Sequence, residues 1–308
     1  RIEKDSMGEI QVPDEKYWGA QTERSYENFK IGIEKMPMEI TRAFAMLKRA
    51  CALANKKFGK LDDRRVNAIT QACEEILAGK LDGNFPLAIW QTGSGTQSNM
   101  NMNEVIANRA TEILGGNFRD KANTPKENLV HPNDHVNMSQ SSNDTFPTAL
   151  HIMAVVEVTN YLMPRLDEFQ QCLEAKSEEF KGIIKNGRTH LQDAVPMTLG
   201  QEFHGWGFTI NDEIENLRAA QEHLKIVNLG ATAIGTTVTA APGYPELAVK
   251  NLAELTGIDF KNSEDLIAAT SDCGAYMTLS SAIKGLAVKM TKVCNDIRLL
   301  ASGPRCGL

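Results

Sequence analysis

Apolar residues recur every three or four positions through much of the second half of the chain, and this periodicity limits the possible folds most strongly. The stripes contain the following residues: Ile152, Val155, Leu162, Leu166, Phe169 and Leu173; Ile214, Leu217, Leu224 and Val227; and Ile283, Leu286, Met290, Val293, Ile297 and Leu300. Such a repeat predicts long α-helices whose apolar faces pack together in a bundle. Few stretches alternate with a period of two, so the sequence predicts an all-α fold.

The longest stripe lies within residues 146–184, which would form a helix more than ~50 Å long. Pro164 lies inside this stretch and is expected to kink the helix without ending it. A bundle of this length cannot cover all of its own apolar faces, so we expect identical chains to associate.

The first 139 residues are expected to form an N-terminal, mostly helical domain that is rich in loops, followed by the long-helix bundle domain over residues 140–308. The expected elements of the first domain are, in order, loops and short turns over residues 1–37, helical patterns over residues 38–80 and 101–114, and a polar loop over residues 117–145. Gly59 is expected to break the first helical pattern.

Composition excludes several classes of protein. The chain of 308 residues has a net charge of −6 and only 6% aromatic residues, so a surface that binds nucleic acid is not expected. No apolar run approaches the ~20 residues of a membrane span. None of the six cysteines forms a C-x-x-C pair, which argues against a zinc site and suits a reducing compartment. Since nothing near Arg1 resembles a signal or transit peptide, we expect a cytoplasmic protein.

Three polar segments interrupt the helical pattern and could bind a ligand; they cover residues 92–99, 139–144 and 187–196. The candidate ligand-binding residues in them are Ser94, Gly95 and Thr96; Ser141, Ser142 and Asn143; and Thr189. Neutral donors at the N-terminus of a helix favour an anion, because the helix dipole adds positive potential there. Helix capping is the alternative role for the first two segments, although a cap needs only one such residue.

His190, in the third segment, is the candidate acid–base group, because histidine titrates near neutral pH. Structural hydrogen bonding is the alternative role for a single histidine. Together, the three segments predict one site in which a small dicarboxylate is held among helix ends and His190 helps to move a proton. These residues alone do not indicate which bond changes.

Four stretches make the sequence resemble the class II fumarase branch of the fumarase/aspartase superfamily. They are residues 85–104, which include Thr-Gly-Ser-Gly-Thr-Gln-Ser-Asn, and residues 131–134, 139–144 and 187–193. The resemblance covers essentially the whole chain. It implies reversible hydration of fumarate to L-malate without a metal or organic cofactor. It also implies a homotetramer in which each active site takes residues from three subunits.

The resemblance assigns roles to particular residues. Those that correspond to substrate-binding positions are Ser94, Gly95, Thr96, Ser141, Ser142, Asn143 and Thr189. His190 corresponds to the active-site histidine, and the resemblance implies that it acts through a water in proton transfer. A second dicarboxylate-binding spot corresponds to His131, Pro132, Asn133 and Asp134, but the arginine that shortly precedes this motif in the family is missing from residues 126–130 here.

Two alternatives to a fumarase remain open. Residues 228–308, and notably residues 264–276, resemble aspartate ammonia-lyase at least as much as fumarase, whereas residues 93–97 and 141–144 favour fumarase. The other alternative is a non-catalytic helical oligomer. The family's serine-bearing catalytic loop and small C-terminal domain would lie beyond Leu308, so we expect this chain by itself to be inactive.

Overall fold

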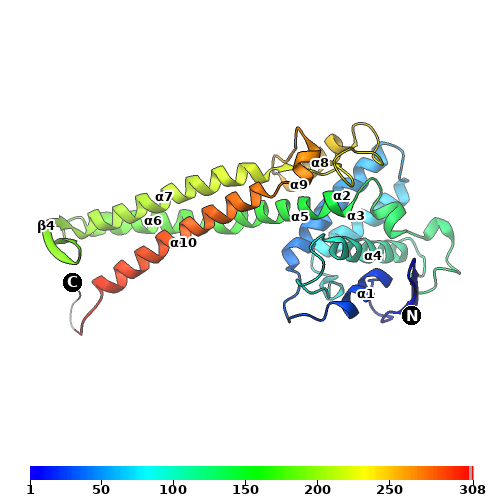
Figure 1. The fold of residues 1–308 in the computed structure, drawn as a ribbon, viewed down its shortest axis with the longest axis horizontal. Helices are drawn as coiled ribbons and strands as arrows, with labels where there is room; N and C mark the ends of the chain where they lie inside the picture. Colours follow the sequence, from blue (N-terminus) through cyan, green and yellow to red (C-terminus); the bar gives the residue numbers. More distant parts are fainter. Residues whose placement is uncertain (305–306, 308) are drawn as a thin grey trace. The chain divides into compact units, whose positions relative to one another are not determined.

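The computed structural model describes residues 1–304 and 307, and contacts divide the chain into two compact, mostly helical units. Unit 1 contains residues 1–153 and 225–272, and unit 2 contains residues 154–224 and the chain from residue 273 onward. The polypeptide therefore leaves unit 1 and returns to it before unit 2 is complete (Figure 1). This division by contacts differs from the expected domain boundary after residue 139.

Packed helices form the core of unit 1: α2 (Met38–Lys57), α3 (Asp63–Leu77), α4 (Thr96–Ile113) and α8 (Tyr244–Thr256). Helix α2 contacts both α3 and α8, and α3 contacts α4. The fully buried core residues include Phe44, Leu47, Ile69, Ile76, Val105, Ile106 and Leu252. They recur at helical spacing, so burial of one apolar face of each helix stabilises the unit.

The predicted break between the first two long helices is confirmed at Gly59. Its φ of 66° lies in the left-handed region, which glycine adopts at little cost. Helix α4 begins at Thr96, earlier than the expected start at residue 101. Polar Asn99 and Asn101 lie on the buried face of this helix, so its first turns lack the apolar spacing on which the prediction depended.

The prediction that residues 1–37 form only loops and turns is wrong. Strands β1 (Ile2–Asp5) and β2 (Gly8–Gln11) pair antiparallel, and α1 covers Ala20–Asn28. The buried carboxylate of Glu104 in α4 accepts hydrogen bonds from three backbone N–H groups at the start of α1. This cap comes from more than 80 residues away, so no local pattern indicates the helix.

Short elements complete unit 1. They are the 3₁₀ turns η1 (Asp82–Asn84) and η2 (Lys126–Asn128), the π-helical turn η3 (Pro132–Val136), the parallel strands β5 (Ile226–Val227) and β6 (Lys261–Asn262), and helix α9 (Leu266–Ser271). The polar loop expected over residues 117–145 therefore contains two helical turns. Val227, which was expected in a helical stripe, lies in β5 because the preceding helix ends at Leu224.

Unit 2 is a bundle of long helices. Helix α5 (Ser142–Glu157) leads into it, and the π-helical turn η4 (Val158–Leu162) joins α5 to α6 (Met163–Glu179); α7 (Leu199–Leu224) and α10 (Gly274–Leu300) follow. Helix α7 packs against both α6 and α10 (Figure 1). The buried stripe residues include Leu166, Leu173, Leu217, Leu286 and Val293. No helix formed by residues 1–304 is both long and apolar enough to span a membrane.

The single helix expected over residues 146–184 is instead two α-helices joined by η4, and it ends at Glu179. The distortion precedes Pro164: the backbone N–H of Met163 donates to the carbonyl of Val158, five residues back. Pro164 has no N–H to donate, and a wider π-helical turn before it tolerates the missing hydrogen bond.

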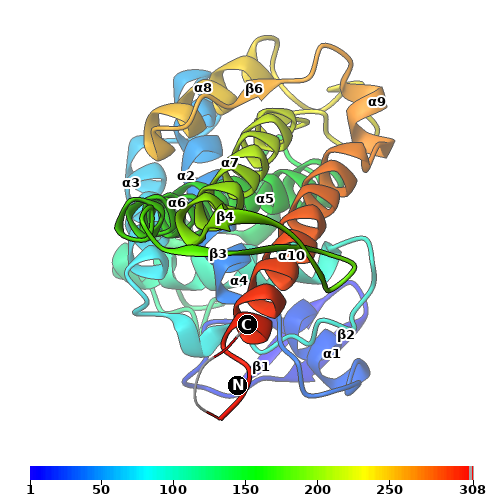
Figure 2. The ribbon, with the colours of Figure 1, turned by 90° about the vertical axis from the view of Figure 1, so that its left-hand side faces the viewer.

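The segment between α6 and α7 forms a β-hairpin, which the sequence analysis did not predict. Strands β3 (Ile184–Thr189) and β4 (Gln192–Thr198) pair antiparallel (Figure 2). His190 and Leu191 form the two-residue turn with φ values of 50° and 64°. Positive φ at both positions is what a type I′ turn requires, and Asn-Gly is its usual sequence. The absence of such residues explains why the hairpin was missed.

Candidate functional site

The first polar segment ends at the N-terminus of α4, where Gly95 is the N-cap residue. Gly95 has a φ of 71°, and a Cβ at this position would lie 2.0 Å from Cγ of Phe146 in α5. Only glycine therefore allows the start of α4 to lie this close to α5. No side chain caps α4 and no acidic residue lies in its first turn, so its own residues leave the positive end of the helix dipole uncompensated.

Three exposed hydroxyl groups lie in a row at this helix start. The Thr92 and Ser94 hydroxyls are 3.1 Å apart, and the Ser94 and Thr96 hydroxyls are 3.2 Å apart. A hydroxyl group can donate to a carboxylate without adding charge of its own. The first segment therefore presents neutral donors in addition to the backbone N–H groups of α4.

The second polar segment lies at the start of α5 and contacts the first. The Nδ2 of Asn99 in α4 is 3.3 Å from Oγ of Ser142, and the Thr145 hydroxyl donates to Oδ1 of Asn99 at 3.1 Å. Asn143 is exposed, and its Nδ2 donates to the carbonyl of Ala233 at 2.7 Å. The two helix starts are thus joined by side-chain hydrogen bonds.

Asp144 anchors the start of α5 from inside the protein. Its side chain is fully buried, and Oδ1 accepts from the backbone N–H of Ser141 at 2.9 Å. Its Oδ2 accepts from the backbone N–H groups of Gly230 and Thr232 at 3.2 and 2.9 Å. Asp144 therefore ties the second segment to the loop that follows β5.

Lys48 of α2 lies beneath both segments and is fully buried. Its Nζ donates to Oδ1 of Asn99 at 2.7 Å, to Oδ1 of Asn137 at 2.9 Å and to Oε1 of Gln140 at 2.9 Å. We call these four residues the Lys48 cluster. The ammonium group has three N–H bonds, and the cluster supplies one amide oxygen for each.

Burial shifts the protonation of both charged groups in this region. It lowers the pKa of Lys48 to about 7, against the opposing effect of the Cys51, Asp144 and Cys73 charges. It raises the pKa of Asp144 to about 7, although backbone hydrogen bonds and the charge of Lys48 oppose this shift. Two groups that titrate near neutral pH therefore lie under a surface of neutral donors.

The third polar segment lies in unit 2, where Thr189 ends β3 and His190 occupies the exposed hairpin turn. The turn borders a cavity of about 370 Å³. Charged side chains from β3, α7 and α10 line it: Lys185, Arg188, Glu202, Lys292 and Asp296. Lys185 pairs with Glu202, and Lys292 pairs with Asp296.

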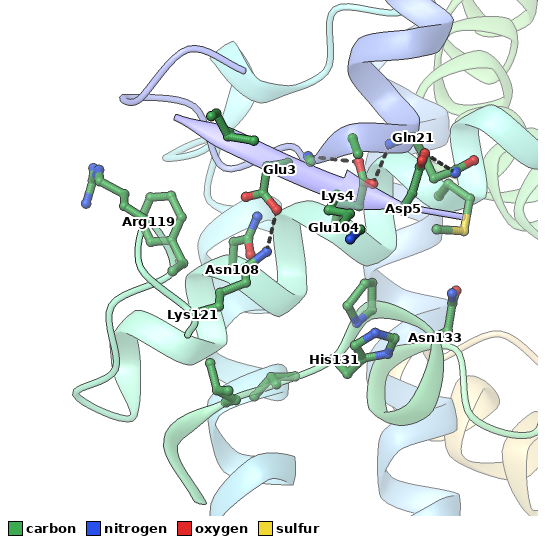
Figure 3. Close-up of a pocket in the computed structure, with 18 of the residues that line it drawn as sticks. Glu3, Lys4, Asp5, Gln21, Glu104, Asn108, Arg119, Lys121, His131 and Asn133 are labelled. Atoms are coloured by element: carbon green, nitrogen blue, oxygen red, sulfur yellow. Dashed lines mark hydrogen bonds and ion pairs between the residues drawn. The ribbon is translucent and has the colours of Figure 1, made fainter. Parts of the chain in front are cut away.

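The second predicted binding spot surrounds the π-helical turn η3. Nδ1 of His131 accepts from the backbone N–H of Asp134 at 3.2 Å. His131, Pro132 and Asn133 line a cavity of about 890 Å³ in unit 1 (Figure 3). Thr96 lines the same cavity, so the first segment and this spot open onto one space.

Paired charges line the opposite wall of this cavity. Lys121 forms an ion pair with Glu3 (Figure 3), and its Nζ lies 2.9 Å from Glu3 Oε2. Asp5 also lines the cavity, and its Oδ2 lies 3.0 Å from Nε of Arg24. Glu104 is buried at the cavity edge, and burial raises its pKa. Within residues 1–304 and 307, no group of three or more His, Cys, Asp or Glu side chains could hold a metal ion.

The structure thus brings together most of the predicted site residues within unit 1. The residues of the two helix starts are Ser94, Gly95 and Thr96 with Ser141, Ser142 and Asn143, and those of the neighbouring spot are His131, Pro132, Asn133 and Asp134. Thr189 and His190 belong to unit 2. That all three segments form one site stays a prediction.

The buried polar residues that support the two helix starts were not among the predicted site residues. Lys48 was the clearest available signal, because it lies in α2 between the buried residues Leu47 and Cys51. A lysine in an apolar stripe is rarely fully buried unless polar groups satisfy it. Its partners could not be found in this way, because Asn137 is 89 residues away in the sequence.

Comparison with known proteins identifies the family of the chain. A family model described as lyase matches residues 8–308. The chain belongs to this lyase family.

Among the relatives of this lyase-family chain is a class II fumarate hydratase of Campylobacter jejuni, which is 58% identical over 308 residues. A class II fumarate hydratase of Bacillus subtilis is 50% identical over 308 residues. Each match covers the whole of this chain and 65% of the relative, so the chain spans slightly less than two-thirds of the length of these relatives. The crystal structure of a recombinant class II fumarase from Schistosoma mansoni matches with a TM-score of 0.94 and 38% identity, covering 100% of this chain and 66% of that one. These findings confirm the resemblance to class II fumarases and the expected long-helix fold.

Proposed function

We propose that this lyase-family protein catalyses the reversible hydration of fumarate to L-malate. The observation that carries the proposal is the junction of the starts of α4 and α5, where Asn99 contacts Ser142 and neutral donors gather. A dicarboxylate fits this chemistry because hydroxyl groups and helix dipoles attract its charge without a full salt bridge. The identity to class II fumarate hydratases supports the same reaction.

The difficult step is proton transfer at a carbon next to a carboxylate. In the malate-to-fumarate direction a base removes this proton, and the electrons pass into the carboxylate as a dianion before hydroxide leaves. In the reverse direction, water supplies the hydroxyl group and the proton. Preorganised donors such as the Ser94, Thr96 and Ser142 hydroxyls stabilise the dianion, at about 3 kcal/mol each by analogy with oxyanion donors.

In the proposed assembly, the residues of the third segment that complete the site come from another copy of the chain. Thr189 supplies a further donor to the substrate carboxylate, and His190 assists proton transfer through a water molecule. His131, Pro132, Asn133 and Asp134 provide a second dicarboxylate-binding spot beside the main site. The shared cavity of Thr96 and His131 supports this assignment.

The proposal extends to the setting in which the enzyme works. We propose a cytoplasmic homotetramer with shared active sites, acting in the tricarboxylic acid cycle, with no nucleic-acid or membrane partner. Exposed apolar residues on the long helices of unit 2, such as Phe208 and Val288, support association of identical chains.

A direct assay tests the activity. The full-length protein is incubated with L-malate and, separately, with L-aspartate, and the absorbance of the fumarate double bond is followed. We expect fumarate from malate and none from aspartate. Fumarate and ammonia from aspartate alone would instead identify an aspartate ammonia-lyase, and no product from either substrate would favour a non-catalytic oligomer.

Substitution of His190 tests its role. His190→Asn is expected to reduce turnover of malate by a factor of ~10² or more while leaving assembly intact, since general acid–base groups contribute about this much. His204→Asn, which changes an exposed histidine near the start of α7, is the matched control and should leave turnover unchanged. Near-normal turnover in His190→Asn would remove His190 from the mechanism.

A further inference from the structure

The Lys48 cluster joins three parts of the chain: helix α2, the first turn of α4, and the stretch that leads into α5. Lys48 belongs to α2, Asn99 lies in the first turn of α4, and Asn137 and Gln140 precede α5. Three hydrogen bonds of 2.7 to 2.9 Å radiate from one Nζ atom, and Lys48 and Asn99 are no more than 1% exposed. One buried side chain is therefore bonded to the supports of both helix starts.

Further hydrogen bonds link the acceptors of Lys48 to each other and to the second segment. Nδ2 of Asn99 lies 3.2 Å from Oδ1 of Asn137 and 3.3 Å from Oγ of Ser142. Gln140 Nε2 donates to the backbone carbonyls of Val136 and Met138 at 3.0 Å. A displacement of Lys48 would therefore reach the α4 start and the α5 start at the same time.

The three acceptors of the cluster match the protonated form of Lys48, which has three N–H bonds and no lone pair. All three acceptors present amide oxygens toward Nζ, and removing the amine would leave those oxygens buried and without that donor. The other titratable groups facing Lys48 are Asp144, Cys51 and Cys73, which are all buried. None of them can replace the three donors.

We propose that Lys48 is a positioning residue that holds the starts of α4 and α5 in register, so that their donors converge on one ligand. Lys48 itself is buried and touches no substrate; it acts through Asn99, Asn137 and Gln140. The link to dicarboxylate binding rests on the proposed function, whereas the effect on the two helix starts does not.

Hydrogen–deuterium exchange of the full-length protein tests the positioning role. In Lys48→Met, peptides covering residues 93–102 and 139–146 should both exchange at least tenfold faster, while peptides of α7 keep their rate. Lys57→Met, which changes a lysine in the last turn of the same helix, is the matched control and should alter neither peptide. Faster exchange at only one helix start, at neither, or uniformly throughout the protein would overturn the proposal.

A second variant keeps the test decisive if Lys48→Met does not fold. Asn137→Ala removes one acceptor but retains Lys48, and it should accelerate exchange in the same two peptides by a smaller factor. Unchanged exchange there would overturn the proposal.

Binding of succinate, a non-reacting dicarboxylate, separates this inference from the proposed function. In titration calorimetry of folded protein, Lys48→Met should raise the dissociation constant of succinate at least tenfold, whereas Lys57→Met should not change it. A purely structural lysine would lower thermal stability without changing succinate affinity, and that result would overturn the proposal. If the unsubstituted protein binds no succinate but the exchange result holds, the proposed function fails and the positioning role stands.

Discussion

Gly93 and Gly95 lie two positions apart in the first segment, but the structure places them in different environments. A Cβ on Gly93 would meet nothing within 4 Å, whereas one on Gly95 would overlap the ring of Phe146. The φ of Gly95 also lies in the left-handed region. The two residues therefore form a matched pair for testing how tightly α4 and α5 are packed at the site.

Gly95→Ala is expected to destabilise the protein by about 3 kcal/mol, from left-handed strain together with overpacking. Gly93→Ala should change stability by less than ~0.5 kcal/mol, as surface substitutions usually do. Urea denaturation of the two variants measures the difference. Equal stabilities would show that the start of α4 is not held against Phe146.

Asp144 is expected to make stability depend on pH. Its pKa rises from 3.8 to about 7 on folding, so the folded state retains a proton that the unfolded state releases in this range. The stability contributed by that proton is therefore fully present below pH 3.8 and is lost as the pH rises through about 7. Relative to Asp144→Asn, the unsubstituted protein should lose on the order of 2 kcal/mol between about pH 5 and about pH 8.

Urea denaturation at the two pH values measures this loss. The charges of Asp144 and Lys48 affect each other's pKa, so the comparison reports the titration of this buried pair. Asp259→Asn changes an exposed carboxylate of unit 1 and should follow the unsubstituted protein at both pH values. A difference between the unsubstituted protein and Asp144→Asn that does not vary with pH would contradict the prediction.

Among the elements, the β3–β4 hairpin has two consecutive residues of the candidate site in a strained backbone conformation. Both turn residues, His190 and Leu191, have positive φ, and Leu191 is 72% exposed. Burial of Leu191 in this chain therefore contributes little free energy to offset the cost of positive φ, which residues with a Cβ disfavour. The strained turn therefore includes the proposed acid–base residue, His190.

Leu191→Gly is expected to stabilise the hairpin by about 1 kcal/mol, because glycine adopts positive φ without steric cost. Val195→Gly, in the extended strand β4, should destabilise it by about 0.5–1 kcal/mol. Hydrogen exchange of the backbone amides over residues 184–198 reports both effects. Slower exchange in Val195→Gly, or faster exchange in Leu191→Gly, would contradict the expected signs.

Unit 2 has large apolar side chains exposed along its helices. Phe208 on α7 is 61% exposed, and Met277 and Val288 on α10 are 69% and 62% exposed. Leu286 and Val293 of the same helix are buried, so α10 has apolar residues on more than one face. Exposed apolar residues in such number are typical of surfaces that associate.

Phe208→Glu and Val288→Glu are each expected to weaken self-association at least tenfold, since burial of such a side chain contributes about 1.5–3 kcal/mol. Sedimentation velocity of the full-length protein measures the mass. Ile33→Glu is the control, because Ile33 is 92% exposed in a loop of unit 1 and should not affect association. A monomeric unsubstituted protein would contradict both the prediction and the proposed homotetramer.

Local sequence patterns were enough to predict the long helices, the break at Gly59 and the membership of a lyase family related to class II fumarases. These features depend on residue spacing and on contiguous motifs, which a local pattern contains. The sequence also indicated the neutral donors of residues 94–96 and 141–143, because helix starts favour such residues locally. The residues that support those donors became evident only in the folded chain. The contacts of Lys48 with Asn137, of Glu104 with the start of α1, and of Asp144 with the loop after β5 each join residues more than 80 positions apart. Burial and hydrogen bonding over such separations arise only when the chain has folded, so no local periodicity reports them.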